Sequence, residues 1–323
     1  MIVRAKNNDD ISFGFFGSGH FAARCLEALL EWRAPAWIVT SPPKRAGRGR
    51  DMRPTPVESF AGNGALLNVP LVRSSSVSSD DDVLFLSRDI PVSFCFVIDF
   101  GQLIREPILS WNEPLGCLNI HPSLLPLYRG AAPVQRALMD RAPEIGVTIF
   151  KLAAAMDSGP ILLREKILVR DDDDSGSLLA RAARTGVRVF TEYLSDRPVS
   201  EWTFSPQDDS IATYADKISP EEERIDWAMP AFEICGKVRA LSPRPGAWTM
   251  ARGRRLKVLS ASISEKSALN APGELIGMGE GGVIAAAGDG CIILEKVQAE
   301  GKKLQAAMEW WNGLHASEGE RLS

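Results

Sequence analysis

The first half of this chain alternates short, wholly apolar runs with segments of helical periodicity, and this alternation limits the folds open to it. Short apolar runs without polar alternation are typical of strands that are buried on both faces of a parallel sheet. We therefore predict an α/β domain with a mostly parallel sheet between layers of helices. Strands are predicted over residues 11–16, 37–40, 92–98, 115–120, 147–152 and 161–169, and helices over 21–32, 135–140 and 178–194.

The pattern changes after residue 194. Residues 195–210 are rich in Asp, Pro, Ser and Gln, which is typical of a linker. Beyond it, the β-like runs LKVLSASI, GGVIAAAG and CIILEKVQ predict a small β-barrel or sandwich, with a helix over residues 231–241. Because 323 residues are enough for two domains, we predict one domain over residues 1–207 and a second over 208–323.

Composition narrows the class of protein. A net charge of -4 argues against a generally basic nucleic-acid-binding surface. The five cysteines are scattered without a CxxC pair, which indicates buried thiols in a reducing compartment. The sequence shows no signal peptide, and no apolar run approaches the ~20 residues of a membrane span. We expect a cytoplasmic protein without a membrane partner and, because no apolar heptad suggests an interface, a monomer.

The segment 17–22, Gly-Ser-Gly-His-Phe-Ala, fits the GxGxxA pattern of dinucleotide-binding turns. That pattern also needs an acid at the end of the next strand, where it binds the ribose hydroxyl. Here the next strand ends in Thr-Ser-Pro-Pro, and no acid lies between Glu31 and Asp51. We interpret the segment as a tight turn that lets a helix pack closely on a strand.

Asn119 and His121 stand two residues apart at a predicted strand end, so their side chains point to the same side. Open α/β sheets place their chemistry at such ends. An amide can stabilise a developing oxyanion, and an imidazole can either donate to the same oxygen or move a proton. Asp157, in the turn after the next strand, could orient the imidazole. From spacing alone, a structural histidine is an equal alternative to a catalytic one.

Longer motifs carry a resemblance to a known family. HPSLLPLYRGAAPVQRAL and GVTIFKLAAAMDSGPILL resemble signatures of the folate-dependent formyltransferases, and RGAAPVQRAL is most similar to the branch that acts on methionyl-tRNA. FGFFGSGHFAARCLEALL, SPPKRAGRGRDMRPTPV and the stretch from ATYADK to RPGAW resemble that branch as well. The resemblance extends from about Ser12 to Gly313.

This resemblance implies a Rossmann-like formyltransferase domain followed by a small, OB-like β-barrel that binds tRNA. It implies transfer of the formyl group of 10-formyltetrahydrofolate to the free amino group of methionyl initiator tRNA, for translation initiation, with no metal. The catalytic residues that it implies, called the predicted trio below, are Asn119, His121 and Asp157. The folate-binding residues that it implies are Ser123, Leu124, Leu125 and Pro126, with Phe100 and Gly101 beside the pocket.

Three positions depart from the family pattern. The family usually has Thr-Pro-acid where this chain has Ser18-Gly19-His20, and Ala-Tyr-Gly where it has Asp99-Phe100-Gly101. The second departure removes a hydroxyl beside the implied folate pocket. Lys44-Arg45 replaces the usual Arg-Pro, which keeps the charge and loses the stiff proline. None of these departures changes the predicted trio.

Two basic segments bear on the acceptor. One loop, residues 44–53, carries five basic residues with only Asp51 opposing them, and residues 237–257 carry seven with no acid. A charge run is usually a solvated face, but two such segments in a net acidic chain favour a local phosphate-binding surface. The predicted tRNA-binding residues are Lys44, Arg45, Arg48, Arg50, Lys237, Arg239 and Arg254.

Two alternatives stay open. A formyltransferase acting on a nucleotide-linked amino sugar or a small purine precursor would share the predicted trio. A non-catalytic folate- or RNA-binding protein on the same scaffold would not need all three groups.

Overall fold

The computed structural model describes residues 11–46, 51–62, 64–112, 115–266, 270–314 and 317–323, and the chain divides into two compact units. Each unit combines several stretches of sequence, so the chain passes between the units more than once. The predicted boundary after residue 207 stays a prediction. Unit 1 comprises Met1–Gly130, Glu144–Leu168 and Leu179–Tyr214, and unit 2 comprises Ala131–Pro143, Val169–Leu178 and Ala215–Ser323.

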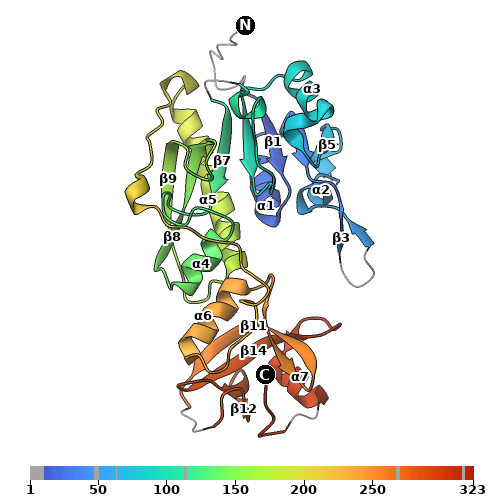
Figure 1. Cartoon of the computed structure of the whole chain (residues 1–323), viewed down its shortest axis with the longest axis vertical. Helices are drawn as coiled ribbons and strands as arrows, with labels where there is room; N and C mark the ends of the chain where they lie inside the picture. Colours follow the sequence, from blue (N-terminus) through green and yellow to red (C-terminus); the bar gives the residue numbers. More distant parts are fainter. Residues whose placement is uncertain (1–10, 47–50, 63, 113–114, 267–269, 315–316) are drawn as a thin grey trace. The chain divides into compact units, whose positions relative to one another are not determined.

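Unit 1 is built on a seven-stranded sheet with the strand order β5-β2-β1-β6-β7-β8-β9 (Figure 1). The first five strands in that order are parallel, and β8 and β9 are antiparallel to their neighbours, so the predicted mostly parallel sheet is confirmed. The central strands are buried along their whole length, as their continuous apolar runs require. The strands are β1 (Phe13–Gly17), β2 (Trp37–Thr40), β5 (Leu71–Arg73), β6 (Phe94–Ile98), β7 (Cys117–His121), β8 (Glu144–Lys151) and β9 (Ile161–Leu168).

Aromatic packing joins a helix to this sheet. The ring of Phe190 lies 5.7 Å from that of Phe94 and 5.0 Å from that of Phe96. Trp32, predicted as the last residue of a helix, instead stacks on Phe13 at 5.5 Å, after a helix that ends at Leu29. The helices are α1 (His20–Leu29), α2 (Pro56–Ala61), α3 (Asp81–Asp89) and α5 (Ser175–Asp196).

A two-stranded hairpin of β3 (Lys44–Ala46) and β4 (Asp51–Arg53) extends away from the sheet of unit 1 (Figure 1). Its described basic residues, Lys44, Arg45 and Arg53, are exposed. Arg48 and Arg50, which are part of the tRNA-binding prediction, lie outside the described residues.

The segment predicted as a linker differs from a free tether. The α5 helix continues to Asp196, and the chain after it is bound along unit 1. Ser205 exchanges both backbone hydrogen bonds with Ile161, each 2.8 Å long, and Arg129 N–H donates to Thr213 O at 2.9 Å. Residues 205 and 213 are thus held by backbone pairing, one with β9 and the other with the loop after β7.

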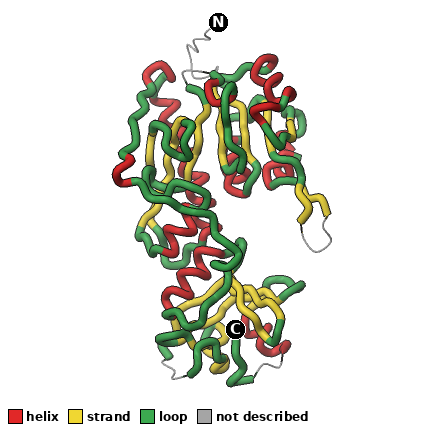
Figure 2. The backbone as a smooth tube through the Cα atoms, viewed as in Figure 1, coloured by secondary structure: helices red, strands yellow, loops and turns green. Residues whose placement is uncertain are grey.

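Unit 2 contains an antiparallel sheet of order β10-β11-β14-β13-β12, with β15 paired to β14, so a β-rich domain follows the α/β domain as predicted. Val238 and Leu241 of the 231–241 helix and Trp310 of the last helix pack in its core. Figure 2 shows the strands of this unit in yellow and its helices in red. Among the described residues, no helix is long and apolar enough to cross a membrane. The elements are α4 (Pro133–Met139), α6 (Ala231–Leu241), β10 (Ala247–Ala251), β11 (Arg254–Ser264), β12 (Leu275–Gly279), β13 (Gly282–Ala286), β14 (Cys291–Ala299), β15 (Gln305–Ala306) and α7 (Ala307–Leu314).

Candidate active site

The carboxyl ends of β1, β6 and β7 lie side by side, because these three parallel strands are neighbours in the sheet. The strand order reverses direction between β1 and β6, and open α/β sheets bind ligands at such a point. The turn after β1 packs tightly there, since a Cβ on Gly19 would lie 1.8 Å from a carboxylate oxygen of Asp99. That carboxylate accepts the Phe21 N–H at 3.1 Å and so caps the start of α1.

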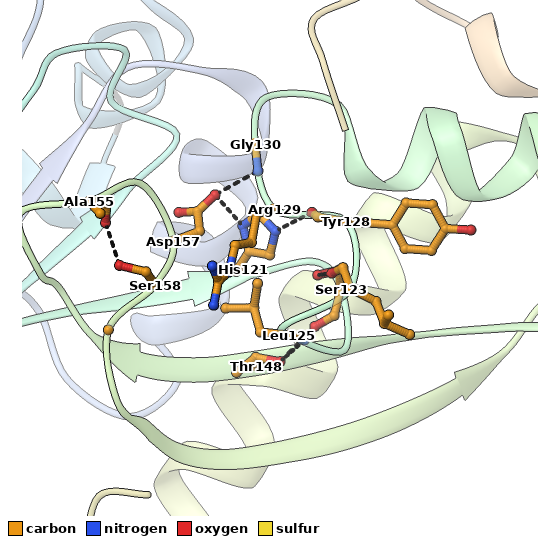
Figure 3. Close-up of polar contacts among 12 residues, drawn as sticks. His121, Ser123, Leu125, Tyr128, Arg129, Gly130, Thr148, Ala155, Asp157 and Ser158 are labelled. Atoms are coloured by element: carbon orange, nitrogen blue, oxygen red, sulfur yellow. Dashed lines mark hydrogen bonds and ion pairs between the residues drawn. The ribbon is translucent and has the colours of Figure 1, made fainter. Parts of the chain in front are cut away.

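His121 ends β7, and its side chain is only 6% exposed. Its Nε2 lies 3.0 Å from Tyr128 O, and because a carbonyl only accepts, the ring N–H donates in this contact (Figure 3). Its Nδ1 lies 3.7 Å from Asp157 Oδ2, an ion-pair distance that is longer than a hydrogen bond. Each ring nitrogen therefore faces an oxygen, and these two contacts orient the imidazole.

Asp157 lies in the turn between β8 and β9, with its backbone in the left-handed region at φ 51°. Its side chain is 14% exposed, and Oδ2 accepts the Gly130 N–H at 2.8 Å (Figure 3). The same oxygen faces His121. The carboxylate is thus fixed by backbone geometry and by a main-chain donor, which orients it toward the imidazole.

Asn119 lies two residues before His121 on β7 and is half-buried. Its side chain makes no hydrogen bond to any other residue that the structure describes. The amide is therefore free to bind a ligand at this strand end. The structure therefore places Asn119 and His121 on one strand and brings Asp157 to His121 from another loop.

The segment after β7 is held by Thr148 of β8. Thr148 Oγ1 accepts the Leu125 N–H at 3.0 Å and donates to Ser123 O at 2.7 Å (Figure 3). The Ser123 hydroxyl donates to Leu127 O at 2.7 Å, and the Leu125 side chain is fully buried. The polar atoms of this segment thus shape its own turn, and a Cβ on Gly146 would lie 2.2 Å from the side chain of Leu124.

The remaining folate-binding predictions follow β6. Phe100 is buried and meets Phe16 edge-on at 5.7 Å, so its ring packs in the core. Gly101 has φ 75° and open space at its Cβ position. The segments 100–101 and 123–126 follow adjacent strands, and this adjacency comes from the parallel pairing of β6 with β7.

Sequence reasoning missed the groups that hold the trio in place. Tyr128 O and Gly130 N–H are main-chain atoms, so side-chain chemistry gave no sign of them. Arg129 stands between them in the RGAAP motif, and its buried guanidinium donates to Gln207 Oε1. Gln207 lies in the segment predicted as a linker, where no periodic pattern marked it.

The predicted tRNA-binding residues that the structure describes divide into two kinds. Lys44, Arg45 and Arg254 are exposed on β3 and β11. Lys237 and Arg239, on α6, make internal bonds: Lys237 Nζ donates to Arg224 O at 3.0 Å, and Arg239 donates to the carbonyls of residues 170 and 173 at 2.7 and 2.8 Å. No cluster of His, Cys, Asp or Glu suited to a metal ion occurs within the described part of the chain.

Comparison with known proteins then gives the family. Residues 11–194 match the sequence profile described as "Formyl transferase", and residues 217–315 match that of "Formyl transferase, C-terminal domain". The chain belongs to the formyl transferase family. Among its relatives, the methionyl-tRNA formyltransferase of Moorella thermoacetica is 36% identical over 309 residues, which is 95% of this formyl transferase and 98% of that protein.

Solved structures share the fold of this formyl transferase. The methionyl-tRNA formyltransferase from Clostridium thermocellum is similar with a TM-score of 0.56 and 15% identity, covering 90% of this chain and 98% of the other. HypX from Aquifex aeolicus, in complex with tetrahydrofolic acid, has a TM-score of 0.66 and 15% identity. That match covers 96% of this chain and 48% of HypX. At these identities, the likeness concerns the fold alone.

Proposed function

We propose that this chain transfers the formyl group of 10-formyltetrahydrofolate to the free amino group of methionyl initiator tRNA. The observation that carries the proposal is the 36% identity to a methionyl-tRNA formyltransferase over nearly the full length of both chains. HypX, which shares the fold, was solved with tetrahydrofolic acid, and this supports a folate donor. The reaction belongs to translation initiation. We expect the chain to act in the cytoplasm as a monomer.

The bound folate supplies the formyl carbon. When the neutral amine of the acceptor adds to that carbon, a new nitrogen–carbon bond forms and the bond from the carbon to N10 of the folate breaks. The amine proton passes to N10, and the formyl oxygen carries negative charge during the transfer. The protein must therefore stabilise that oxygen and carry one proton.

Asn119 and His121 supply these two functions in the proposal. The unpartnered amide of Asn119 donates to the charged oxygen, and one such donor typically contributes roughly 100- to 1000-fold in rate. His121 carries the proton between the amine and N10 through Nε2, which exchanges its contact with Tyr128 O for the substrate, and a placed acid or base is typically worth about 100- to 10000-fold. Asp157 holds the imidazole ring from its Nδ1 side.

The test is a formylation assay with the purified chain, 10-formyltetrahydrofolate and methionyl initiator tRNA. We expect formylmethionyl-tRNA as the product, with no product from uncharged tRNA. His121→Ala and Asp157→Ala should each lower kcat by roughly 100-fold or more while tetrahydrofolate still binds in calorimetry. A wild-type chain that formylates a nucleotide-linked amino sugar and leaves methionyl-tRNA unchanged would contradict the proposal.

A further inference from the structure

Residues 195–216 lie between the two family profiles, which cover residues 11–194 and 217–315. Part of this segment is bound next to the candidate active site. Thr213 N–H donates to Pro126 O at 3.2 Å, and Tyr128 N–H donates to the Thr213 hydroxyl at 2.8 Å. These bonds align residues 207–214 with the loop that follows His121.

Gln207 makes the main side-chain contact from this segment. Its Nε2 donates to Asp157 O and to Gly159 O, both at 2.8 Å. Its Oε1 accepts from Arg129 Nε at 3.1 Å and from an Arg129 terminal nitrogen at 2.7 Å. An amide offers two N–H donors and an oxygen with two lone pairs, so all of its hydrogen-bonding capacity is used.

These four bonds join the two loops that frame His121. One loop carries Asp157, whose carboxylate faces the imidazole. The other carries Arg129, which lies between the carbonyl that binds His121 Nε2 and the N–H that binds Asp157. The Arg129 side chain is 5% exposed, and its guanidinium also donates to Asp209 Oδ1 at 2.6 Å, so the segment after α5 supplies two acceptors to it.

We propose that Gln207 is a positioning residue for formyl transfer, an inference that rests on the proposed function. Gln207 holds the left-handed turn at Asp157 against Arg129 and so keeps the carboxylate aligned with His121. The orientation of the Gln207 amide matters, because its nitrogen donates to the two carbonyls of the Asp157 turn while its oxygen accepts from Arg129, which also pairs with Asp209.

The Gln207→Glu variant keeps the contact of residue 207 with Arg129 and removes its contact with the Asp157 turn. The carboxylate keeps an acceptor for Arg129 and, by charge, binds it more strongly. Its second oxygen stands where the amide nitrogen was and faces the carbonyl oxygens of Asp157 and Gly159. Both hydrogen bonds to the Asp157 turn are therefore lost. Gln207→Leu removes both contacts. Asp208→Ala is the matched control, since Asp208 is exposed and its side chain bonds only Ser210 among the described residues.

The kinetic experiment measures formyl transfer by each variant. We expect Gln207→Glu and Gln207→Leu to lower kcat by roughly 10- to 100-fold, with KM for both substrates changed by less than about 3-fold, because misplaced catalytic groups slow the chemistry. In an Asp157→Ala background, either Gln207 variant should lower kcat further by less than about 3-fold. Gln207 acts through the Asp157 carboxylate, which is already absent there. Asp208→Ala should match the wild type. Independent, multiplying effects would overturn the proposal.

A second measurement separates this inference from the proposed function. The chain has only three histidines, so ring ¹⁵N resonances of labelled protein can be assigned with His121→Ala. Gln207→Glu should shift the His121 ring signals and leave those of His20 in place, while Asp208→Ala shifts neither. If the wild type formylates no tRNA, the proposed function fails, and this shift still tests the positioning role. Unchanged His121 signals in folded Gln207→Glu would overturn that role.

Discussion

At the scale of single residues, Asn119 differs from its neighbours in the candidate site. His121 and Asp157 are fixed by their contacts with Tyr128, Gly130 and each other. Asn119 makes no side-chain hydrogen bond to another described residue, so its half-buried amide serves the fold little. Because no other described residue engages this amide, it is open to a ligand at the strand end.

Asn119→Ala should therefore affect activity much more than stability. We expect kcat for formyl transfer to fall by roughly 100- to 1000-fold through loss of an oxyanion donor. The unfolding free energy should change by less than about 1 kcal/mol, because no intramolecular hydrogen bond is removed. Steady-state kinetics and urea unfolding provide the two values.

Asn119→Asp is the control for shape, because it keeps the volume and replaces the donor with a charged acceptor. It should be at least as inactive as Asn119→Ala, since it repels the oxygen that the amide stabilises. Full activity in either variant would remove Asn119 from the mechanism.

At the scale of elements, β8 supports the loop that follows β7. Thr148 is fully buried opposite His121, and its one hydroxyl both accepts from Leu125 and donates to Ser123. Thr148→Val keeps the shape and leaves two main-chain groups without a partner. We expect it to lower the unfolding free energy by about 1–3 kcal/mol, as measured by urea unfolding.

The Thr148→Val variant should also weaken tetrahydrofolate binding if residues 123–126 line the folate site. Thr148→Ser keeps the hydroxyl and should retain most of the stability and the binding. If Thr148→Ser loses as much stability as Thr148→Val, the methyl group matters and the hydroxyl does not.

A second element-scale contact ties α4 to the turn that precedes α6. Glu222 accepts two hydrogen bonds from the Arg136 guanidinium, and this contact, with a smaller contribution from Ser219 N–H, lowers the pKa of Glu222 to about 2. A carboxyl whose folded pKa is depressed adds stability above its unfolded pKa and loses it as the pH falls toward the folded one. The window here is about pH 4.5 to 2.

Glu222→Gln should accordingly be less stable than the wild type at pH 7, by about 0.5–1 kcal/mol because the Glu222 side chain is 38% exposed. The difference should shrink as the pH falls below about 4.5 and vanish near pH 2. Urea unfolding at pH 7, 5 and 3 measures it, with Glu223→Gln as the control. A gap that widens on acidification would contradict the ion pair.

The elements themselves were largely predictable from the sequence. Strand β2 and helix α6 coincide with their predicted spans. Each is a short apolar pattern next to prolines, which end strands and helices. The short elements α2, β5 and β10 were missed, since a few residues carry too little periodicity and tertiary contacts decide their state. The placement of Asn119 and His121 on one strand end was predictable from their spacing, and the catalytic roles of the trio stay a prediction, whereas Gln207 depends on pairing between distant segments.

At the scale of the whole molecule, the proposed tRNA surface depends on charge. Lys44→Ala, Arg45→Ala and Arg254→Ala should each weaken tRNA binding and leave tetrahydrofolate affinity unchanged. If each residue contacts one phosphate, the slope of log affinity against log salt should fall by roughly 1 for each variant. Filter binding over a salt series measures the slope.

Two control variants test whether the change in salt dependence is specific to the predicted tRNA-binding residues. Arg88→Ala removes another exposed arginine, from α3, that is outside the predicted surface and should leave the slope unchanged. Arg239→Ala should mainly destabilise unit 2, because it leaves two carbonyls without their donor. A slope that is the same for wild type, Lys44→Ala, Arg45→Ala and Arg254→Ala would contradict the predicted surface.

The division of the chain into interleaved segments has a consequence for synthesis on the ribosome. Helix α4 is made between β7 and β8, yet it packs against α6, which is made only after the last segment of unit 1. At ~5–20 residues per second, α4 waits on the order of ten seconds for that partner. During this interval the side of α4 that later packs against α6, including Met139, is open to chaperones while β8 and β9 are still being synthesised.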